Sequence, residues 1–150
     1  MVHYEFQQSV RDVLHSAKMT ACELGHETLT PDHILLALLA SDAPSVAPIL
    51  DGSLASRADA TEAWRRSLIP GGGSSSRREV PYSPSAKRVL EHAMISARSL
   101  GHEWIATSHL LGGLMKLEDS KAATFLREHG LEADQVEAAV AVHSADETSA

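Results

Sequence analysis

The sequence predicts an all-α fold built from two similar repeats, and three observations lead to this prediction. The first is a pattern, Leu-Gly-His-Glu with a later histidine, that begins at Leu24 and again at Leu100. The second is a set of apolar residues at helical spacing in the segment before each copy. The third is the glycine and proline residues that separate the segments. Because self-similarity at a fixed interval decides the architecture of a chain, the duplication weighs most.

The repeat extends well beyond the four-residue pattern. Segments 6–39 and 82–115 align without gaps at an interval of 76 residues, which is the distance in sequence from Gly25 to Gly101. One four-helix unit of this size would be marginally stable, so we expect two units of about four helices each to pack about a pseudo-twofold axis. The identical pairs are Ser9/Ser85, Val13/Val89, Leu14/Leu90, Ala17/Ala93, Ala21/Ala97, Leu24/Leu100, Gly25/Gly101, His26/His102, Glu27/Glu103, His33/His109, Leu35/Leu111 and Leu38/Leu114.

The expected elements follow from periodicity, caps and breaks. Gly25 and Gly101 each supply the left-handed residue that commonly ends a helix, and Pro31 and Pro84 fit the first turn of the next one. Ser83 is expected to cap the helix that Pro84 begins, and Thr107 or Ser108 the one after Gly101. We expect helices over 6–24, 31–40, a short stretch through Val46, Ile49 and Leu50, 57–68, 84–100, 122–129 and 132–142, besides the one that starts near 107. The whole chain, 1–150, is predicted to be a single domain with repeats at 4–69 and 82–143, a flexible linker at 70–81 and a disordered tail at 144–150.

Composition excludes several classes of partner. The chain has 150 residues, 22% of them charged, and a net charge of −7. Non-specific nucleic-acid binding and polybasic membrane attachment both need a basic face, so neither partner is expected. The longest apolar run, Ile34 to Ala40, is too short to span a bilayer, and no signal peptide is visible. A single cysteine, Cys22, fits a reducing, cytoplasmic location.

The repeated histidines and glutamates suggest chemistry, but a structural role is the better interpretation. His26, His33, His102 and His109 pair by repeat and lack the spacing of a helical zinc site, so we expect them to bond backbone groups. Glu27 and Glu103 sit at equivalent loop positions without an evident nucleophile. No metal, cofactor or catalytic residue is therefore expected, although a small hydrolase or metal protein stays open as an alternative class.

The paired units resemble the double repeat at the N-terminus of Clp-type AAA+ unfoldases of the ClpC/ClpA group, over about residues 6–142. The motifs that carry this resemblance are Phe-x₃-Val-x₂-Val-Leu and Leu-Gly-His-x₆-His-Ile-Leu-Leu-x-Leu. The resemblance implies an all-helical pseudo-dimer that docks adaptors and substrates ahead of ATPase rings. No GxxxxGK[ST] loop is present, because Gly71 to Gly73 lead into serines. The chain is thus similar to an isolated domain or a stand-alone protein, and its polar tail favours the latter.

The resemblance also implies ligand sites. ClpC-like relatives bind phosphoarginine once per repeat, through a carboxylate before the motif histidine and a hydroxyl that opens the first helix. By this resemblance, Gln7 and Asp32 belong to the first site, and Ser83 and Ser108 belong to the second. A carboxylate suits a guanidinium, and helix-start groups suit a phosphate.

A groove between the repeats is implied as well, with His3, Phe6, Val13, Tyr82 and Val89 near it. Relatives of this kind accept hydrophobic cyclic peptides there. The leading hypothesis is a non-enzymatic module that binds substrates, adaptors or degrons, with Clp ATPase or protease components as partners. The alternative is a decoy that sequesters cyclic-peptide antibiotics.

Overall fold

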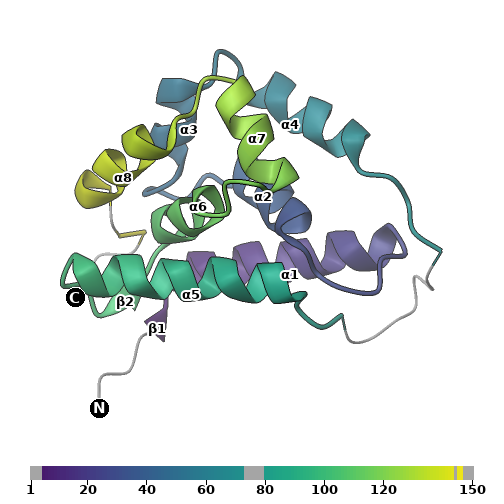
Figure 1. Cartoon of the computed structure of the whole chain (residues 1–150), viewed down its shortest axis with the longest axis horizontal. Coiled ribbons are helices and arrows are strands. Elements are labelled where there is room, and N and C mark those ends of the chain that lie inside the picture. Colours follow the sequence, from purple (N-terminus) through teal and green to yellow (C-terminus); the bar gives the residue numbers. More distant parts are fainter. Residues whose placement is uncertain (1–4, 73–79, 144, 147–150) are drawn as a thin grey trace.

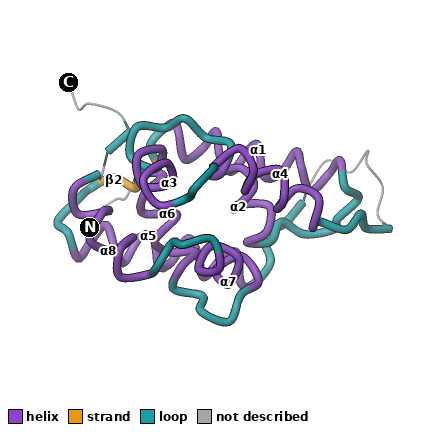
Figure 2. Tube along the Cα trace, turned by 90° about the horizontal axis from the view of Figure 1, so that it is seen from above, coloured by secondary structure: helices purple, strands orange, loops and turns teal. Residues whose placement is uncertain are grey.

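Eight helices account for nearly all regular structure in the part of the chain that the computed structural model describes, which is residues 5–72, 80–143 and 145–146. Figure 2 shows the same dominance of helix, with only short strand segments. The all-α prediction is confirmed. The elements are β1 (Glu5–Phe6), α1 (Gln8–Glu23), α2 (Pro31–Leu39), α3 (Ala47–Ser53), α4 (Arg57–Ser67), α5 (Pro84–Ser99), β2 (Trp104–Ile105), α6 (Thr107–Met115), α7 (Lys121–Glu128) and α8 (Ala133–Val142).

The predicted helix boundaries hold within a few residues because periodicity and stop signals act together. Along α1 the buried residues are Val10, Val13, Leu14, Ala17 and Ala21, which form a single helical stripe. Gly25 and Gly101 have positive φ angles of 70° and 76°, as expected for residues that end α1 and α5.

Helices α2 and α6 form the centre of the molecule. Almost every residue of α2 is buried, and the same holds for α6. Figure 1 shows both helices in the middle, with α1 and α5 below them and α3, α4, α7 and α8 around the upper side. Each central helix contacts elements of both repeats. One shared core therefore joins the repeats, as the limited core of a single unit demands.

Two short parallel contacts exchange chain segments between the repeats, and the sequence did not predict them. In the first, β1 pairs with β2 so that Phe6 lies opposite Ile105. In the second, Tyr82 lies opposite Leu29. These contacts are equivalent at the interval of 76 residues, and each joins the start of one repeat to the loop of the other. The predicted pseudo-twofold arrangement is therefore visible in the backbone.

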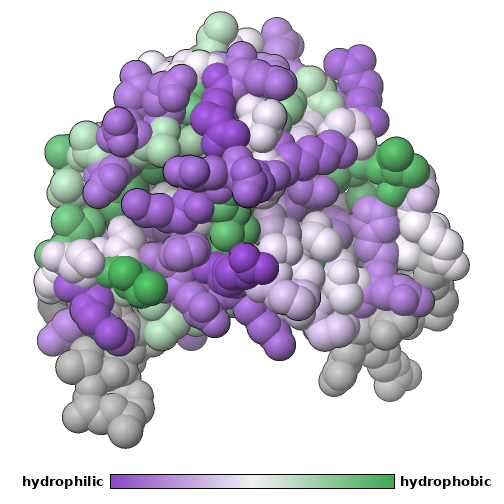
Figure 3. Space-filling view, viewed as in Figure 1, coloured by the Kyte–Doolittle hydropathy of each residue, from purple (hydrophilic) through white to green (hydrophobic). Residues whose placement is uncertain are grey.

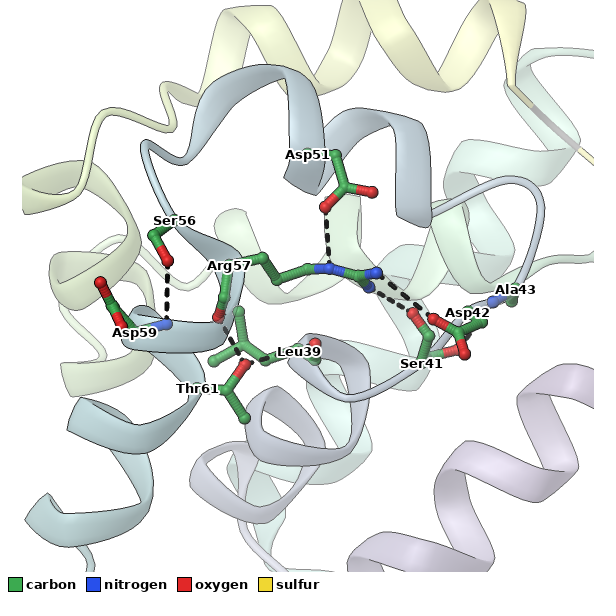
Figure 4. Close-up of polar contacts among 9 residues, drawn as sticks. All are labelled: Leu39, Ser41, Asp42, Ala43, Asp51, Ser56, Arg57, Asp59 and Thr61. Carbon is green, nitrogen blue, oxygen red and sulfur yellow. Dashed lines mark hydrogen bonds and ion pairs between the residues drawn. The ribbon is translucent and has the colours of Figure 1, made fainter.

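A guanidinium fixes the packing of α4 in the first repeat. Figure 4 shows the Arg57 side chain reaching from the start of α4 to the segment that follows α2. It donates to the Ser41 carbonyl oxygen and lies 2.9 Å from Asp51 and 3.3 Å from Asp42. At the equivalent place in the second repeat stands Ala133, which cannot make this bridge.

The predicted linker and tail lie partly outside the described residues, namely at 73–79, 144 and 147–150. The linker ends that are described are anchored, since the Gly71 amide bonds the Leu24 carbonyl oxygen at 2.7 Å and Val80 is buried. In the tail, Asp146 is held by hydrogen bonds from both repeats. Asp146 therefore has defined partners, while the disordered tail over 144–150 stays a prediction. No helix of the described part is long and apolar enough to cross a bilayer.

Candidate functional site

The four residues predicted to bind a ligand lie in two groups. Each group contains one residue from the first repeat and one from the second. The Gln7 amide donates to the Ile105 carbonyl oxygen at 3.0 Å, which places Gln7 beside the start of α6 and Ser108. The Ser83 amide donates to the Leu29 carbonyl oxygen at 2.9 Å, which places Ser83 beside the start of α2 and Asp32. The assignment of Gln7 with Asp32, and of Ser83 with Ser108, is corrected accordingly. The strand exchange is the physical reason.

An open cavity of about 570 Å³ lies where Asp32 meets the second repeat. We call it the charged cleft. Its walls come from the start of α2, the outer side of α5 and the segment between α6 and α7. Both signs of charge line it, with Asp32, Glu118 and Asp119 as acids and Arg88, Lys116 and Lys121 as bases. Ser83 itself is nearly buried, and its hydroxyl accepts from the Ala86 amide as the cap of α5, as expected.

Asp32 is the acidic residue of this cleft that the sequence singled out. Burial raises the pKa of its carboxyl, while Lys121 and His26 act to lower it. Its position is fixed through the backbone, because the Trp64 indole donates to the Asp32 carbonyl oxygen at 2.9 Å. The ammonium of Lys121 lies 5.5 Å from the centre of the same indole ring. In this cleft, an acidic residue and a basic residue both contact the indole of Trp64.

Next to the charged cleft lies an apolar groove of about 190 Å³ between α5, α6 and α8. Ile95 on α5 and Leu100, which follows the helix, are exposed by 55% and 40% respectively, and they line the groove with Met115 and Val136. The hydrophobic surface in Figure 3 occurs in separate patches on a mostly polar face, and some of them lie on the left, over α8 and the end of α5. The groove and the charged cleft share His92 and Lys116 as lining residues, so they form one continuous surface.

The groove exists because three of its residues are smaller than the residues at the equivalent positions of the first repeat. Its residues Gly112, Ala133 and Val140 occupy positions equivalent to Leu36, Arg57 and Trp64 of the first repeat. There the larger side chains of Leu36 and Trp64 are buried, and Arg57 is bonded to its neighbours. Smaller residues therefore leave room in the second repeat that the first repeat fills. This signal is present in the sequence, but only once the repeats are aligned.

Gln7 and Ser108 lie at the other crossing of the repeats, where Asp146 is bound next to an open cavity of about 360 Å³ that includes Ser9 and Asp12 in its lining. The Gln7 side-chain oxygen accepts from the Asp146 amide at 2.7 Å. Ser108 is fully buried, and its amide donates to the Ser45 hydroxyl at 3.0 Å. Its own hydroxyl has no partner among the described residues. The sequence did not indicate Ser45 or Asp146, because neither the segment between α2 and α3 nor the polar tail carries a periodic signal.

The described positions predicted for the cyclic-peptide groove are not gathered in one place, and of the two valines it is Val13 that lines a cavity, one of about 360 Å³. Val89 has no exposed surface and Val13 is 4% exposed, so both belong to the core. Phe6 and Tyr82 lie in the two separate strand contacts, opposite Ile105 and Leu29. His3 is outside the described residues. Val89 is turned inward toward the core, whereas Val13 is mostly buried but borders a cavity. The cyclic-peptide groove stays a prediction.

The repeated histidines bond backbone groups, as the structural interpretation requires. The Thr30 amide donates to Nδ1 of His33 at 2.9 Å, and the Ala106 amide to Nδ1 of His109 at the same distance. His33 Nε2 lies 2.6 Å from His26 Nδ1, and His26 Nε2 lies 2.7 Å from the Ile69 carbonyl oxygen. Among the described residues, no three potential metal ligands gather.

The fold and the crossed sites define a class of protein: a duplicated, all-helical domain whose two repeats exchange their first segments. The sequence profile of the Clp repeat (R) N-terminal domain matches residues 5–129. The chain belongs to this family.

Individual relatives agree with this membership. The chain is 33% identical over 131 residues to the negative regulator of genetic competence ClpC/MecB of Bacillus subtilis (strain 168), a match that covers 87% of the chain but 16% of the relative. It is 31% identical over 131 residues to the chloroplastic chaperone protein ClpC1 of Oryza sativa subsp. japonica, covering 87% of the chain and 14% of the relative. The chain thus spans about a sixth of the length of these relatives.

Solved structures agree on the fold. The N-terminal domain of ClpD from Arabidopsis thaliana superposes with a TM-score of 0.68 at 26% identity, covering 95% of both chains. The N-domain of ClpV from Vibrio cholerae gives a TM-score of 0.77 at 17% identity, covering 95% of this chain and 89% of the other. A complex of a ClpV N-domain with a VipB peptide gives 0.75 at 17% identity, covering 97% and 91%.

Proposed function

We propose that this chain is a non-enzymatic peptide-binding module that recognises substrate or adaptor segments through the second repeat. The observation that carries the proposal is the continuity of the apolar groove with the charged cleft at His92 and Lys116. A surface that joins apolar walls to a few convergent charged groups suits a segment with apolar and charged side chains. The structure of a ClpV N-domain with a peptide supports the same kind of ligand.

The partners follow from the family. The relatives include ATP-binding subunits of Clp proteases, so we propose that the module delivers segments to a Clp ATPase or protease, in the cytoplasm. The decoy function for cyclic peptides has less support, because two of its predicted groove residues are buried.

The groove is tested by fluorescence anisotropy with reduced, carboxymethylated α-lactalbumin as the unfolded probe. Ile95→Ser removes exposed apolar surface from the groove, and Met19→Ser makes the same change at the equivalent, 46% exposed position of α1. We expect Ile95→Ser to weaken binding about tenfold, in keeping with the loss of one well-placed apolar contact. Met19→Ser should leave the affinity unchanged. Equal effects of the two changes would overturn the assignment of the groove.

A second variant fills the groove instead of trimming it. A Cβ at position 112 would meet only Val140 Cγ2 within 4 Å, at 3.7 Å, an ordinary contact. Gly112→Leu restores the residue type of position 36 and should reduce probe binding without loss of fold. Unchanged affinity in a folded Gly112→Leu protein would contradict the proposal.

The finer proposal is that the charged cleft accepts a phosphoarginine-like group. Asp32 would pair with the guanidinium, and Lys121, Arg88 and the Ser85 hydroxyl would face the phosphate. Isothermal titration with free phosphoarginine should show saturable binding that Asp32→Asn and Lys121→Ala weaken. Arginine and inorganic phosphate are the matched ligands, and Glu128→Gln, an exposed carboxylate elsewhere on α7, is the matched variant. No saturable binding at millimolar phosphoarginine would remove this ligand while leaving the apolar groove untouched.

A further inference from the structure

The start of α6 carries a pocket in which a carboxylate of the same chain is bound. Asp146 Oδ1 accepts from the Ser45 amide at 2.8 Å, the Ser45 hydroxyl at 2.6 Å and the Thr107 hydroxyl at 2.9 Å. Its Oδ2 accepts from the Thr107 amide at 2.7 Å and the Ser9 hydroxyl at 2.6 Å. We call Ser9, Ser45 and Thr107 with Gln7 the tail pocket. Its donors come from both repeats and converge on one anion.

The tail pocket is built from groups that need an acceptor. Ser45 and Thr107 are buried, so an amide or hydroxyl without a partner there would be costly. The N-cap residue of α6 is Ala106, not Thr107 or Ser108 as the sequence predicted, and its methyl group cannot accept from the first amides of the helix. Asp146 supplies that acceptor from another part of the chain. Burial acts to raise the pKa of Asp146, but hydrogen bonds from Ser45, Ser9 and Thr107 together hold it below its usual range.

The equivalent place in the other repeat is an open cavity. Ser9 and Ser45 correspond to Ser85 and Lys121, which both line the charged cleft, and Thr107 corresponds to Pro31, another lining residue. The duplicated scaffold therefore has a ligand-sized space at both crossings of the repeats. At the charged cleft the space is open, whereas at the other crossing Asp146 is bound beside an open cavity of about 360 Å³ that includes Ser9 in its lining.

Contacts to the main chain indicate that the occupant is a peptide rather than a simple ion. Gln7 Oε1 accepts from the Asp146 amide at 2.7 Å while the carboxylate is held by the donors. Because the pocket binds both the amide and the carboxylate of Asp146, it selects the length of the side chain between them. An aspartate meets this distance, and a glutamate is one methylene longer.

We propose that the tail pocket is a binding site for an aspartate-bearing peptide segment, and that the segment around Asp146 is its intramolecular ligand. An acidic segment of a partner protein competes with it for the same donors. This site is separate from the groove and the charged cleft, so the inference does not rest on the proposed function.

The test uses a fluorescein-labelled peptide with the sequence of residues 141–150, added to the full chain. An attached ligand has a high effective concentration, so the unaltered chain should bind the peptide about tenfold or more weakly than Asp146→Ala, whose pocket is vacated. The same peptide with alanine in place of its aspartate should not bind. Equal binding to both proteins, or no binding to either at millimolar concentration, would overturn the proposal and leave Asp146 as a structural clamp only.

Controls locate the binding. Thr107→Val in the Asp146→Ala chain should abolish peptide binding, and Glu128→Gln should behave like the unaltered chain. In ¹⁵N–¹H spectra, Asp146→Ala should shift the Ser45 and Thr107 amide signals, and the added peptide should return them toward their original positions. If Asp146→Ala does not fold, Asp146→Asn gives the same comparison, since it keeps the shape and removes the charge. Amide signals that the peptide does not move would contradict the assignment.

Discussion

The two buried histidines, His33 and His109, each use both ring nitrogens in hydrogen bonds. Because a backbone amide donates to Nδ1 of His33, the neutral ring carries its proton on Nε2, which points to His26 Nδ1. His26 then donates from Nε2 to the Ile69 carbonyl oxygen. This chain of bonds ties the start of α2 to the end of α4. A second proton on His33 would break it, because Nδ1 would then face a donor.

His33→Ala should lower the free energy of unfolding by about 1–3 kcal/mol, because the change leaves the Thr30 amide without its acceptor. The measurement is urea denaturation followed by circular dichroism. His15→Ala, at an exposed position of α1, is the matched control and should change stability little. Equal losses for both variants would contradict the structural role of His33.

Acid should destabilise the fold through these residues. Burial, with a smaller effect of His26, lowers the pKa of His33 to about 4, and burial with His102 does the same for His109. Between pH 6.5 and 4 the unfolded chain binds protons on both histidines while the folded chain does not. Stability should therefore be constant above pH 6.5 and fall below it, by about 1.4 kcal/mol per pH unit and per histidine.

The pH dependence is measured by urea titrations across this range, against the double variant His33→Gln/His109→Gln. The pKa of Asp32 is raised, so its titration acts in the opposite direction, but the comparison cancels it because both proteins keep Asp32. A slope that persists unchanged in the double variant would show that other groups cause it.

At the level of elements, α5 and α6 pack at close range because of one glycine. A Cβ on Gly113 would lie 2.4 Å from the Val89 carbonyl oxygen and 3.1 Å from the Ala93 amide nitrogen. The neighbouring Gly112 faces the apolar groove instead, where a Cβ has room. The two glycines of α6 thus have different roles, one in close packing and one in leaving the groove open.

Gly113→Ala should destabilise the protein by about 1–3 kcal/mol, since overpacking forces the helices apart. Gly112→Ala should instead be neutral or stabilising by up to about 1 kcal/mol, because alanine favours the helix. Thermal and urea unfolding of the two variants measure this difference. A loss of stability for Gly112→Ala, or none for Gly113→Ala, would contradict the packing described.

The sequence predicted helices better than the contacts that place the sites. Long amphipathic segments such as α1 and α5 carry a period and end at Gly25 and Gly101, so their limits could be predicted. The strand contacts are two residues long or shorter and have no period. Without knowledge of these contacts, Gln7 is expected to lie near Asp32 of the same repeat. The pairing of β1 with β2 instead places Gln7 beside the second repeat. Asp146 could not be found, because nothing local marks a tail residue that docks on a distant helix start.

At the scale of the whole molecule, the duplication has produced two unequal halves. The second repeat keeps an open surface because Gly112, Ala133 and Val140 are small. At the other crossing of the repeats, the chain fills the tail pocket with Asp146. The pseudo-symmetric scaffold therefore has an apolar groove in the second repeat and an internally bound carboxylate at the start of α6, besides open cavities that are lined mainly by the first repeat.

The most direct test of this asymmetry is a ¹⁵N–¹H titration of the full chain with reduced, carboxymethylated α-lactalbumin. We expect amide shifts to concentrate at Ile95, Leu100, Gly112 and Lys121, with the equivalent positions Met19, Leu24, Leu36 and Ser45 unperturbed. Shifts of equal size at both sets of positions, or at the first-repeat set alone, would contradict the proposal that the second repeat carries the peptide-binding groove.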